Sequence, residues 1–514
     1  MTNDRLPDIL VFMSDQHSGR IMGNVGDPLI RTPTMDALAA NGVNFTSAYT
    51  SCPLCIPARA GFLTGQLPAT NLVYTNYQAI PSDQATFLHA LTAQGYETVL
   101  CGRMHFLGPD QSHGFAKRIF GEMTTCFWGR TKFRKTRGPL SSAFLGIYAL
   151  NNTGKGYSPV LEYDAACVRA AVEYLAEPHE KPQCVVVGTY GPHAPYIAPP
   201  DLFDYYRDRV ELPRSMQTES VNKAYTYDHI TELRTKKGFA PKSPGAGIPD
   251  DLILDARAAY YGMIEYQDRI LGQVKEAWDA HLERSKREGL FVYTSDHGQM
   301  MGERWNFGKQ VFYEDSERIP FLVEGNGVQK NRTVKGHVSI LDIPATLCEL
   351  AGADTLPRLD GISLRPELTG DREDMDRTVL ADFLPLWHES GSAGQIHETL
   401  ADIELKDLKK PSRMIRAGDY KYVHYTSKYE EDQLFNLNND PDELQNLAQQ
   451  EPDTAAKLKS ILREGWEPKR IADVMEDRLE HVRFLVKYGD ALWLDAHEQD
   501  LWMPVDIEKY YVER

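Results

Sequence analysis

Residues 51–65, SCPLCIPARAGFLTG, combine a cysteine and an arginine at a spacing that suits chemistry on an anion. Pro53 and Pro57 favour an extended chain before them, and a helix is expected from Ala58, with Pro57 suited to its first turn. Cys55 is therefore expected near a helix N-terminus, where unpaired N–H groups and the helix dipole attract negative charge. Arg59 lies one turn further along and adds a fixed positive charge on the same side.

Cys55 also has plainer interpretations, which the spacing alone leaves open. The thiol could be a small buried hydrophobe, with Arg59 as a surface ion-pair partner. Cys52-x-x-Cys55 could be half of a zinc site or a redox pair, but the sequence has no second CxxC and no HxxxH to complete a zinc site. The seven cysteines are an odd number and widely scattered, which is not the pattern of a disulfide framework.

Polar side chains with acid–base or metal-binding capacity directly follow several predicted strands. These strands are residues 8–13, 97–101, 184–187 and 290–294. The side chains that follow them are Asp15 and Gln16, Arg103 and His105, His193, and Asp296 and His297. One Asp after a strand is usually a helix cap, but open α/β sheets place their sites at the carboxyl ends of strands. The repeated pattern therefore predicts one site at one edge of one sheet.

The elements that would position these side chains alternate between apolar strands and helices. Helices are expected at residues 32–42, 86–94, 163–175 and 256–282, and a further strand at residues 43–49. This alternation over about 350 residues predicts an α/β domain with a large, mixed, mostly parallel sheet flanked by helices. Thr32 is expected to be the N-cap of the first of these helices, with Pro33 as its first helical residue. Residues 121–160 and 200–250 are expected to be irregular.

The pattern changes after about residue 370, and we predict a catalytic domain at 1–370. Residues 371–465 are predicted to form a smaller α+β subdomain with an antiparallel sheet, because 412–425 has the form of a hairpin around Gly418-Asp419. Residues 466–514 are expected to be a helical and aromatic tail that contacts another subunit.

Composition excludes some classes of function. The net charge of −17 argues against nonspecific nucleic-acid binding as the role of this chain. The N-terminus lacks the basic and apolar regions of a signal peptide, and no apolar run approaches the roughly 20 residues that span a bilayer. A cytoplasmic enzyme with no membrane partner is therefore the expectation.

Taken together, the motifs resemble the type I sulfatases of the alkaline phosphatase superfamily. The signature of that family is matched by Cys55-x-Pro57-x-Arg59 followed by Leu63-Thr64-Gly65. The resemblance continues through Asp15, Gly102-x-x-His105, Gly191-Pro-His-Ala-Pro-Tyr196, Asp296-His-Gly298, Gly308-Lys309 and the segment 434–443. It therefore extends over nearly the whole chain and implies an alkaline-phosphatase-like fold.

The resemblance implies that a separate maturation enzyme converts Cys55 to formylglycine. The hydrated aldehyde would attack the sulfur of a small-molecule sulfate ester with one hydroxyl and expel sulfate with the other. It also implies a divalent cation, calcium first and magnesium or manganese behind it. The implied ligands are Asp15, Gln16, Cys55, Asp296 and His297, with Gln16 where many sulfatases have Asp and His297 where many have Asn.

The remaining catalytic and substrate-binding roles are also implied by the resemblance. His193 matches the general acid and His105 the base, while Arg59 would hold the diol and Lys309 a sulfate oxygen. Arg103 stands where the family usually has Lys and would clamp the sulfate. Asn76 matches an Asn that faces the substrate. His17 and His113 are expected to be structural, and Cys52 to pack within its loop.

The substrate is the least determined feature. Asp15-Gln16 and the segment 102–115 resemble choline sulfatases, whereas Asp-Gln and Pro-Ala-Arg also occur in phosphonate monoester hydrolases. We therefore expect a sulfuric ester hydrolase, with a phosphonate monoester or phosphodiester hydrolase as the alternative and a non-catalytic anion-binding protein as the third. A homo-oligomer, dimer or tetramer, is expected from the aromatic tail.

Overall fold

The computed structural model describes most of the residues that the sequence predicts to form helices and strands. The described residues are 6–122, 128, 150, 153–216, 248–384, 410–426 and 431–492. The predicted irregular stretches at 121–160 and 200–250 lie partly outside these residues, and the aromatic end of the tail, residues 493–514, lies wholly outside them.

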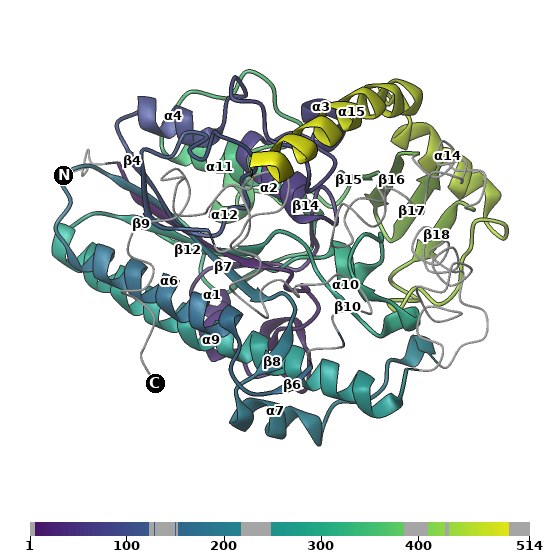
Figure 1. Ribbon diagram of the computed structural model, residues 1–514, viewed down its shortest axis with the longest axis horizontal. Coiled ribbons are helices and arrows are strands. Elements are labelled where there is room, and N and C mark those ends of the chain that lie inside the picture. Colours follow the sequence, from purple (N-terminus) through teal and green to yellow (C-terminus); the bar gives the residue numbers. More distant parts are fainter. Residues whose placement is uncertain are drawn as a thin grey trace.

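An eight-stranded sheet forms the centre of the molecule (Figure 1). Its strands, in spatial order, are β13 (Arg332–Val334), β2 (Val43–Phe45), β12 (Phe321–Gly325), β9 (Gly289–Ser295), β1 (Asp8–Asp15), β7 (Gln183–Pro192), β4 (Glu97–Gly102) and β5 (Lys117–Phe120). Only β12 pairs antiparallel with its neighbours β9 and β2, and the remaining pairs are parallel. The predicted mixed, mostly parallel sheet is therefore confirmed.

Helices cover both faces of this sheet (Figure 1). One face carries α1 (Pro33–Asn41), α6 (Pro159–Ala176) and α9 (Asp250–Ser285), and the other carries α2 (Cys55–Thr64), α4 (Phe87–Ala93) and α11 (Asp342–Leu350). Strand β1 is buried on both sides because Leu10 and Phe12 join the first core while Ile9 and Val11 join the second.

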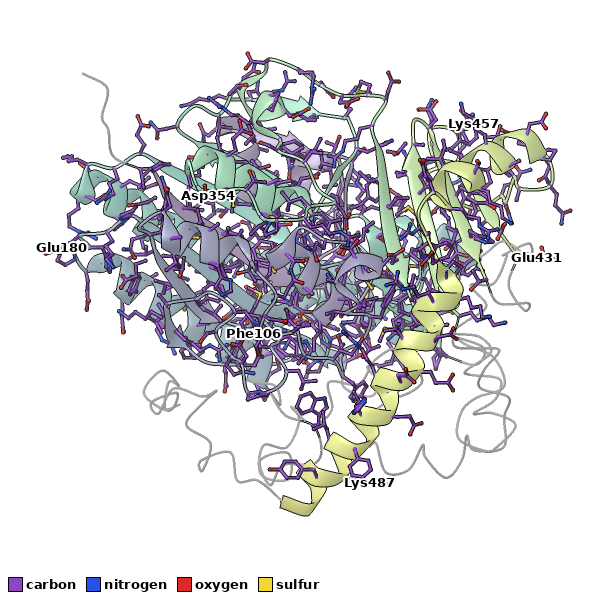
Figure 2. All side chains as sticks on the ribbon, turned by 90° about the horizontal axis from the view of Figure 1, so that it is seen from above. Phe106, Glu180, Asp354, Glu431, Lys457 and Lys487 are labelled. Carbon is purple, nitrogen blue, oxygen red and sulfur yellow. The ribbon has the colours of Figure 1, made fainter. Side chains whose placement is uncertain are left out.

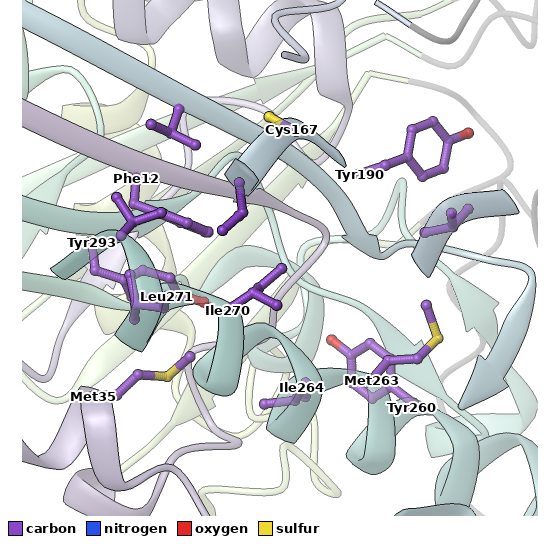
Figure 3. Packing of buried hydrophobic residues seen from close by; sticks show 14 of the residues in the cluster. Phe12, Met35, Cys167, Tyr190, Tyr260, Met263, Ile264, Ile270, Leu271 and Tyr293 are labelled. Carbon is purple, nitrogen blue, oxygen red and sulfur yellow. The ribbon is translucent and has the colours of Figure 1, made fainter. Parts of the chain in front are cut away.

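The first core is built from aromatic and branched side chains on adjacent strands and on α9. Phe12 of β1 and Tyr293 of β9 have ring centroids 5.9 Å apart. Figure 3 shows both rings beside Ile270 and Leu271 of α9. This packing fixes α9 against the two strands whose ends carry predicted site residues.

Short elements complete the main body. They are β3 (Ala48–Tyr49), β14 (Val338–Ser339), β6 (Thr153–Lys155), β8 (Tyr196–Ala198), β10 (Met300–Met301), β11 (Phe307–Gly308), α3 (Pro68–Asn71), α7 (Pro200–Arg207), α10 (Glu314–Glu317), α12 (Arg365–Thr369), and the 3-10 turns Gly23–Val25, Arg214–Met216 and Glu303–Trp305.

A four-stranded antiparallel sheet follows in the C-terminal part. Its order is β15 (Thr378–Phe383), β16 (Ser412–Ala417), β17 (Tyr420–Tyr425) and β18 (Gln433–Asn436). The predicted hairpin is confirmed, since Ala417 pairs with Tyr420 across the two-residue turn. Helices α14 (Pro452–Leu462) and α15 (Pro468–Leu492) follow, and α15 extends away from the body in Figure 2. The domain boundaries at 370 and 465 stay predictions.

Four local predictions differ from the structure. The stretch 200–250, expected to be irregular, begins with helix α7 at Pro200–Arg207, where Pro200 lies in the first turn. The strand expected at 43–49 is two strands, because β2 pairs with β12 and β13 whereas β3 pairs with β14. Thr32 precedes α1, but its side chain does not cap that helix and instead accepts a hydrogen bond from the N–H of Gly23 at 2.9 Å. Helix α2 begins at Cys55, three residues earlier than the helix expected from Ala58.

The search for membrane-spanning helices gave a negative result for the described residues. None of their helices combines the length and the apolarity that crossing a bilayer requires.

Candidate active site

The strands with polar ends are consecutive in the sheet, in the order β9, β1, β7 and β4. Their carboxyl ends therefore meet at one edge, as the sequence predicted. Gly102, at the end of β4, has a φ of +90°, and a Cβ there would lie 2.3 Å from the carbonyl oxygen of Gly188 in β7. Only glycine allows this close approach, which brings the chain at Arg103 against β7.

Cys55 is the first residue of α2 and is 1% exposed. Leu54 before it has an extended backbone and no capping side chain. The Oδ1 atom of Asn76 takes that place, because it accepts a hydrogen bond from the N–H of Ile56 at 2.9 Å. The predicted position of Cys55 at a helix N-terminus is therefore correct, and Asn76 lies at the same helix start.

Three side chains from distant parts of the sequence surround the sulfur of Cys55. Lys309 Nζ lies 3.0 Å from it, His297 Nε2 3.3 Å and Asp15 Oδ1 3.9 Å. Lys309 follows the short strand β11, and its Nζ also donates to Gln16 Oε1 at 2.5 Å. The surroundings of Cys55 thus combine a cation, an imidazole and a carboxylate around one atom.

Asp15, Cys55, Asp296 and His297 each offer a ligand atom, and these atoms lie within 4.8 Å of one another. Two carboxylates and an imidazole form a donor set suited to a divalent cation. His297 Nδ1 lies 3.0 Å from the carbonyl oxygen of Gly298, so Nδ1 carries the ring proton and the lone pair of Nε2 faces Cys55. Burial lowers the pKa of His297 to about 4, so the ring is neutral, as a ligand must be.

Arg59 and Arg103 neutralise the carboxylates of this cluster. Arg59 donates to Asp296 Oδ2 at 2.9 Å and to Asp15 Oδ2 at 3.0 Å, and Arg103 Nε donates to Asp15 Oδ2 at 2.6 Å. Burial alone would raise the pKa of Asp15, but Arg103 and Arg59 outweigh it and hold that pKa well below its usual range. Arg59 is therefore buried in the site and is not a surface ion-pair partner.

His193 lies beyond the end of β7, with its ring centroid 5.0 Å from that of Tyr190. Its Nδ1 lies 2.9 Å from the carbonyl oxygen of Ala194, so Nδ1 carries a proton and Nε2 is free to exchange one. Burial and then the charge of Lys309 lower the pKa of His193 well below its usual range. A negative charge bound nearby would raise this pKa and favour the protonated ring.

The thiol of Cys55 itself is not activated. Burial and the Asp15 carboxylate raise its pKa to about 11, despite the opposing charge of Lys309. Cys52 is buried in an apolar cluster with Tyr49 and Leu54, and it does not belong to the four-residue metal cluster. The zinc and redox interpretations of Cys52-x-x-Cys55 therefore have no support among the described residues.

Comparison with known proteins identifies the family. The sulfatase family model matches residues 7–353, which is more than half of the chain. The chain belongs to the sulfatase family. A second model, the C-terminal region of N-sulphoglucosamine sulphohydrolase, matches residues 302–472 of this sulfatase.

Named relatives cover most of the sulfatase. It is 30% identical to the choline-sulfatase of Rhizobium meliloti over 459 residues, which is 86% of this chain and 82% of the relative. It is 24% identical to human arylsulfatase K, over 89% of this chain and 82% of the relative. Together with the fold, these matches make it a type I sulfatase of the alkaline phosphatase superfamily and a sulfuric ester hydrolase.

Solved structures have the same fold. The phosphonate monoester hydrolase of Agrobacterium radiobacter superposes with a TM-score of 0.67 at 22% identity, covering 89% of this sulfatase and 95% of that chain. A structure in complex with its substrate D-glucosamine-2-N,6-O-disulfate has a TM-score of 0.68 at 19% identity, with coverages of 91% and 98%.

The structure also adds residues that sequence reasoning missed. Glu122 contacts Arg103 and the backbone of His105, Gln299 accepts from the amide of Gln16, and the ring of Tyr190 lies 4.4 Å below the Arg103 guanidinium. No sequence signal could have placed Glu122 here, whereas Tyr190 lies three residues before His193 at the same end of β7. Gln299 could have been found, because it lies two residues after His297 at the end of the same strand.

The two histidines expected to be structural make local contacts. His17 is buried between the hydroxyl of Tyr293 at 2.8 Å and the carbonyl of Ile21 at 2.9 Å, and His113 lies 3.4 Å from Asp110. Neither contact reaches Cys55.

Proposed function

We propose that this sulfatase hydrolyses an organic sulfate monoester with a formylglycine made from Cys55 and a divalent cation held beside it. Once hydrated, formylglycine supplies one hydroxyl that attacks sulfur and a second that lets sulfate leave, and the cation polarises the sulfate oxygens. The observation that carries the proposal is the convergence of Lys309, His297 and Asp15 on the Cys55 sulfur. A buried thiol whose pKa is raised is better suited to be a precursor than a nucleophile.

The cation would be held by Asp15, Cys55, Asp296 and His297. Their donor chemistry fits a hard divalent ion, with the neutral His297 Nε2 as one ligand atom. Gln16 is the fifth proposed ligand: its backbone N–H donates to Asp296 Oδ1 at 3.0 Å, and its side-chain oxygen lies beside Lys309. Calcium is proposed first because the set is dominated by oxygen, with magnesium or manganese next.

The side chains around this centre divide the remaining tasks. Lys309 binds a sulfate oxygen, and Arg59 holds the nucleophile against the two carboxylates it bridges. His193 gives the leaving alcohol its proton from Nε2. Asn76 contacts the substrate from the helix start that it caps. Arg103 and His105 complete the set, and their contacts are developed in the next section.

A phosphonate monoester or phosphodiester is the second candidate substrate. The structural likeness to phosphonate monoester hydrolases supports this second candidate. Attack on phosphorus would use the same divalent cation, the same cationic side chains and the same nucleophile. The alcohol part of a sulfate substrate is open among the classes named for the relatives: choline sulfate, aryl sulfates and sugar sulfates.

The experiment is a comparison of kcat/KM on matched aryl sulfate and aryl phosphonate monoesters, followed by a panel of choline, aryl and sugar sulfates. A higher kcat/KM on the sulfate supports the proposal. A large preference for the phosphonate assigns the second function. Absence of turnover in protein that retains Cys55 as a thiol after co-production with a maturation enzyme would favour an anion-binding role.

The proposed partners are the maturation enzyme and a second copy of the chain. Helix α15 exposes Phe484 and Tyr488, which are 76% and 60% accessible and four residues apart on one helical face. Sedimentation of the wild type and of a Phe484→Ser/Tyr488→Ser double variant measures whether this face joins subunits in a dimer or tetramer.

A further inference from the structure

Glu122 is a buried carboxylate with contacts to two points of the loop that carries Arg103 and His105. It lies two residues after β5 and is 1% exposed. Its Oε1 accepts from Arg103 Nη1 at 3.1 Å, and its Oε2 accepts from the backbone N–H of His105 at 2.8 Å. His105 has a φ of +58°, which non-glycine residues rarely adopt. Glu122 therefore holds both the guanidinium and a strained backbone position.

Arg103 in turn contacts the ring of His105. Its Nη2 lies 2.9 Å from His105 Nδ1, while its Nε is bound to Asp15 and its plane stacks over Tyr190. A guanidinium has only donors and keeps its charge in proteins. The lone pair of His105 Nδ1 must therefore accept this hydrogen bond. A neutral His105 then carries its proton on Nε2.

The neutral form is the one that the surroundings favour. Burial and the adjacent Arg103 lower the pKa of His105 well below its usual range. Both ring nitrogens of the neutral form are then assigned: Nδ1 accepts from Arg103, and Nε2 has a hydrogen to donate. A ring in this state has no free lone pair with which to remove a proton.

We propose that Glu122 is a positioning residue that holds Arg103 against His105 and so fixes His105 in the Nε2-protonated tautomer, as a hydrogen-bond donor to the sulfate group and not as a base. The target of the donated hydrogen bond rests on the proposed function, whereas the tautomer does not. Glu122 also explains why an arginine is accommodated at position 103. The guanidinium of Arg103 has several N–H donors, and Glu122 gives it a second carboxylate in addition to Asp15.

The proton of the second hydroxyl then needs another acceptor, and His193 is suited to it. When His193 has given its Nε2 proton to the leaving alcohol, that nitrogen has a lone pair, while Nδ1 stays bound to the Ala194 carbonyl. Nε2 would take the proton of the second hydroxyl while the C–O bond to sulfate breaks and the C=O bond of formylglycine re-forms. His193 ends protonated, as it began, so one histidine serves both halves of the cycle.

The direct test is the tautomer of His105 in the wild-type holoenzyme without substrate. Histidine labelled with ¹⁵N distinguishes the two ring nitrogens in long-range ¹H–¹⁵N correlation spectra, and a His105→Gln variant assigns the signal. The expected result is a neutral ring protonated on Nε2 throughout the pH range of activity. A ring protonated on Nδ1, or on both nitrogens, would overturn the proposal. This readout does not depend on which ester the enzyme hydrolyses, so it separates this proposal from the proposed function.

The role of Glu122 is tested with Glu122→Gln, with Glu122→Asp as the conservative variant and the exposed Glu180→Gln as the control (Glu180 is labelled in Figure 2). We expect Glu122→Gln to lower kcat by about 10- to 100-fold with a smaller change in KM, and to show a second His105 tautomer. Glu122→Asp is expected to recover part of kcat. Equal kcat values and an unchanged tautomer in Glu122→Gln and Glu180→Gln would refute the positioning role.

Discussion

Lys309 Nζ lies 3.0 Å from the sulfur of Cys55, although the two residues are 254 positions apart in the chain. Both are buried, Lys309 at 4% and Cys55 at 1% exposure. The fold therefore places a positive charge directly beside the atom that we propose is converted during maturation. In a site closed to water, such a charge stabilises developing negative charge more strongly than it would at the surface.

Replacing Lys309 with methionine removes this charge and keeps most of the side-chain volume. We expect kcat/KM for the sulfate ester to fall by roughly 10²- to 10³-fold, as for the loss of one preorganised donor. Steady-state kinetics on the matured variant measures the effect. The exposed Lys330→Met is the matched control and should retain wild-type kcat/KM. Similar kcat/KM values for the two variants would show that Lys309 does not act on the substrate.

His193→Ala is expected to separate substrates by their leaving groups. The lost proton donor matters most when the leaving alcohol is a poor leaving group, so alkyl sulfates should lose about 10²- to 10⁴-fold in kcat/KM, which reports the steps up to release of the alcohol, and activated aryl sulfates much less. A plot of log kcat/KM against the pKa of the leaving alcohol measures this, with a steeper slope expected for the variant. Equal losses across the series would refute the acid role.

Lys421 of β17 joins the C-terminal sheet to helix α10 and to Glu443 through a buried ion cluster. Its Nζ lies 3.1 Å from Glu314 Oε1 and also contacts Glu443, and its side chain is fully buried. Lys421→Met leaves buried carboxylates without their cation and should lower the free energy of unfolding by about 3–5 kcal/mol. Chemical denaturation measures it.

The control for this loss is Lys155→Met, which breaks an exposed pair with Asp204. The free energy of unfolding of that variant should be within about 1 kcal/mol of the wild-type value. Equal losses in the free energy of unfolding for Lys421→Met and Lys155→Met would show that the buried cluster does not stabilise the contact between the C-terminal sheet and α10.

Asp432 is expected to make the C-terminal part sensitive to acid. Burial raises the pKa of its carboxyl, but hydrogen bonds from His424, Tyr422 and Lys459 outweigh this and hold the pKa below its usual range. Because the pKa of Asp432 is depressed in the folded state, its carboxylate contributes its full stabilisation of the fold above the pKa of an unfolded Asp, about 3.9. This contribution is lost as the pH falls below that value.

Asp432→Asn cannot titrate, so the stability difference between wild type and variant should narrow as the pH falls below about 4. Urea unfolding at neutral pH and at acid pH measures that difference. The exposed Asp354→Asn serves as the control, with no narrowing expected. A difference that stays constant with pH would contradict the assignment.

The sequence predicted the sheet and the meeting of its strand ends because both follow from local patterns. Apolar runs such as residues 8–13 predict buried strands, and polar residues directly after them must lie at the carboxyl edge. It could not predict that Glu122 bridges Arg103 and His105, because that contact depends on how β5 pairs with β4. The start of α2 was missed for a similar reason: Asn76, 21 positions later, supplies the cap that lets the helix begin at Cys55.

The central claim is that Cys55 is the precursor of the nucleophile, and the most direct measurement relates its chemical state to turnover. Protein produced with graded amounts of a formylglycine-generating enzyme is analysed by peptide mass spectrometry at position 55, and kcat on the best sulfate ester is measured for each preparation, with Cys52→Ala as the matched control. We predict that kcat rises in proportion to the fraction of formylglycine at position 55 and extrapolates to zero for the unmodified thiol. Full turnover by protein whose Cys55 remains a thiol would contradict the account.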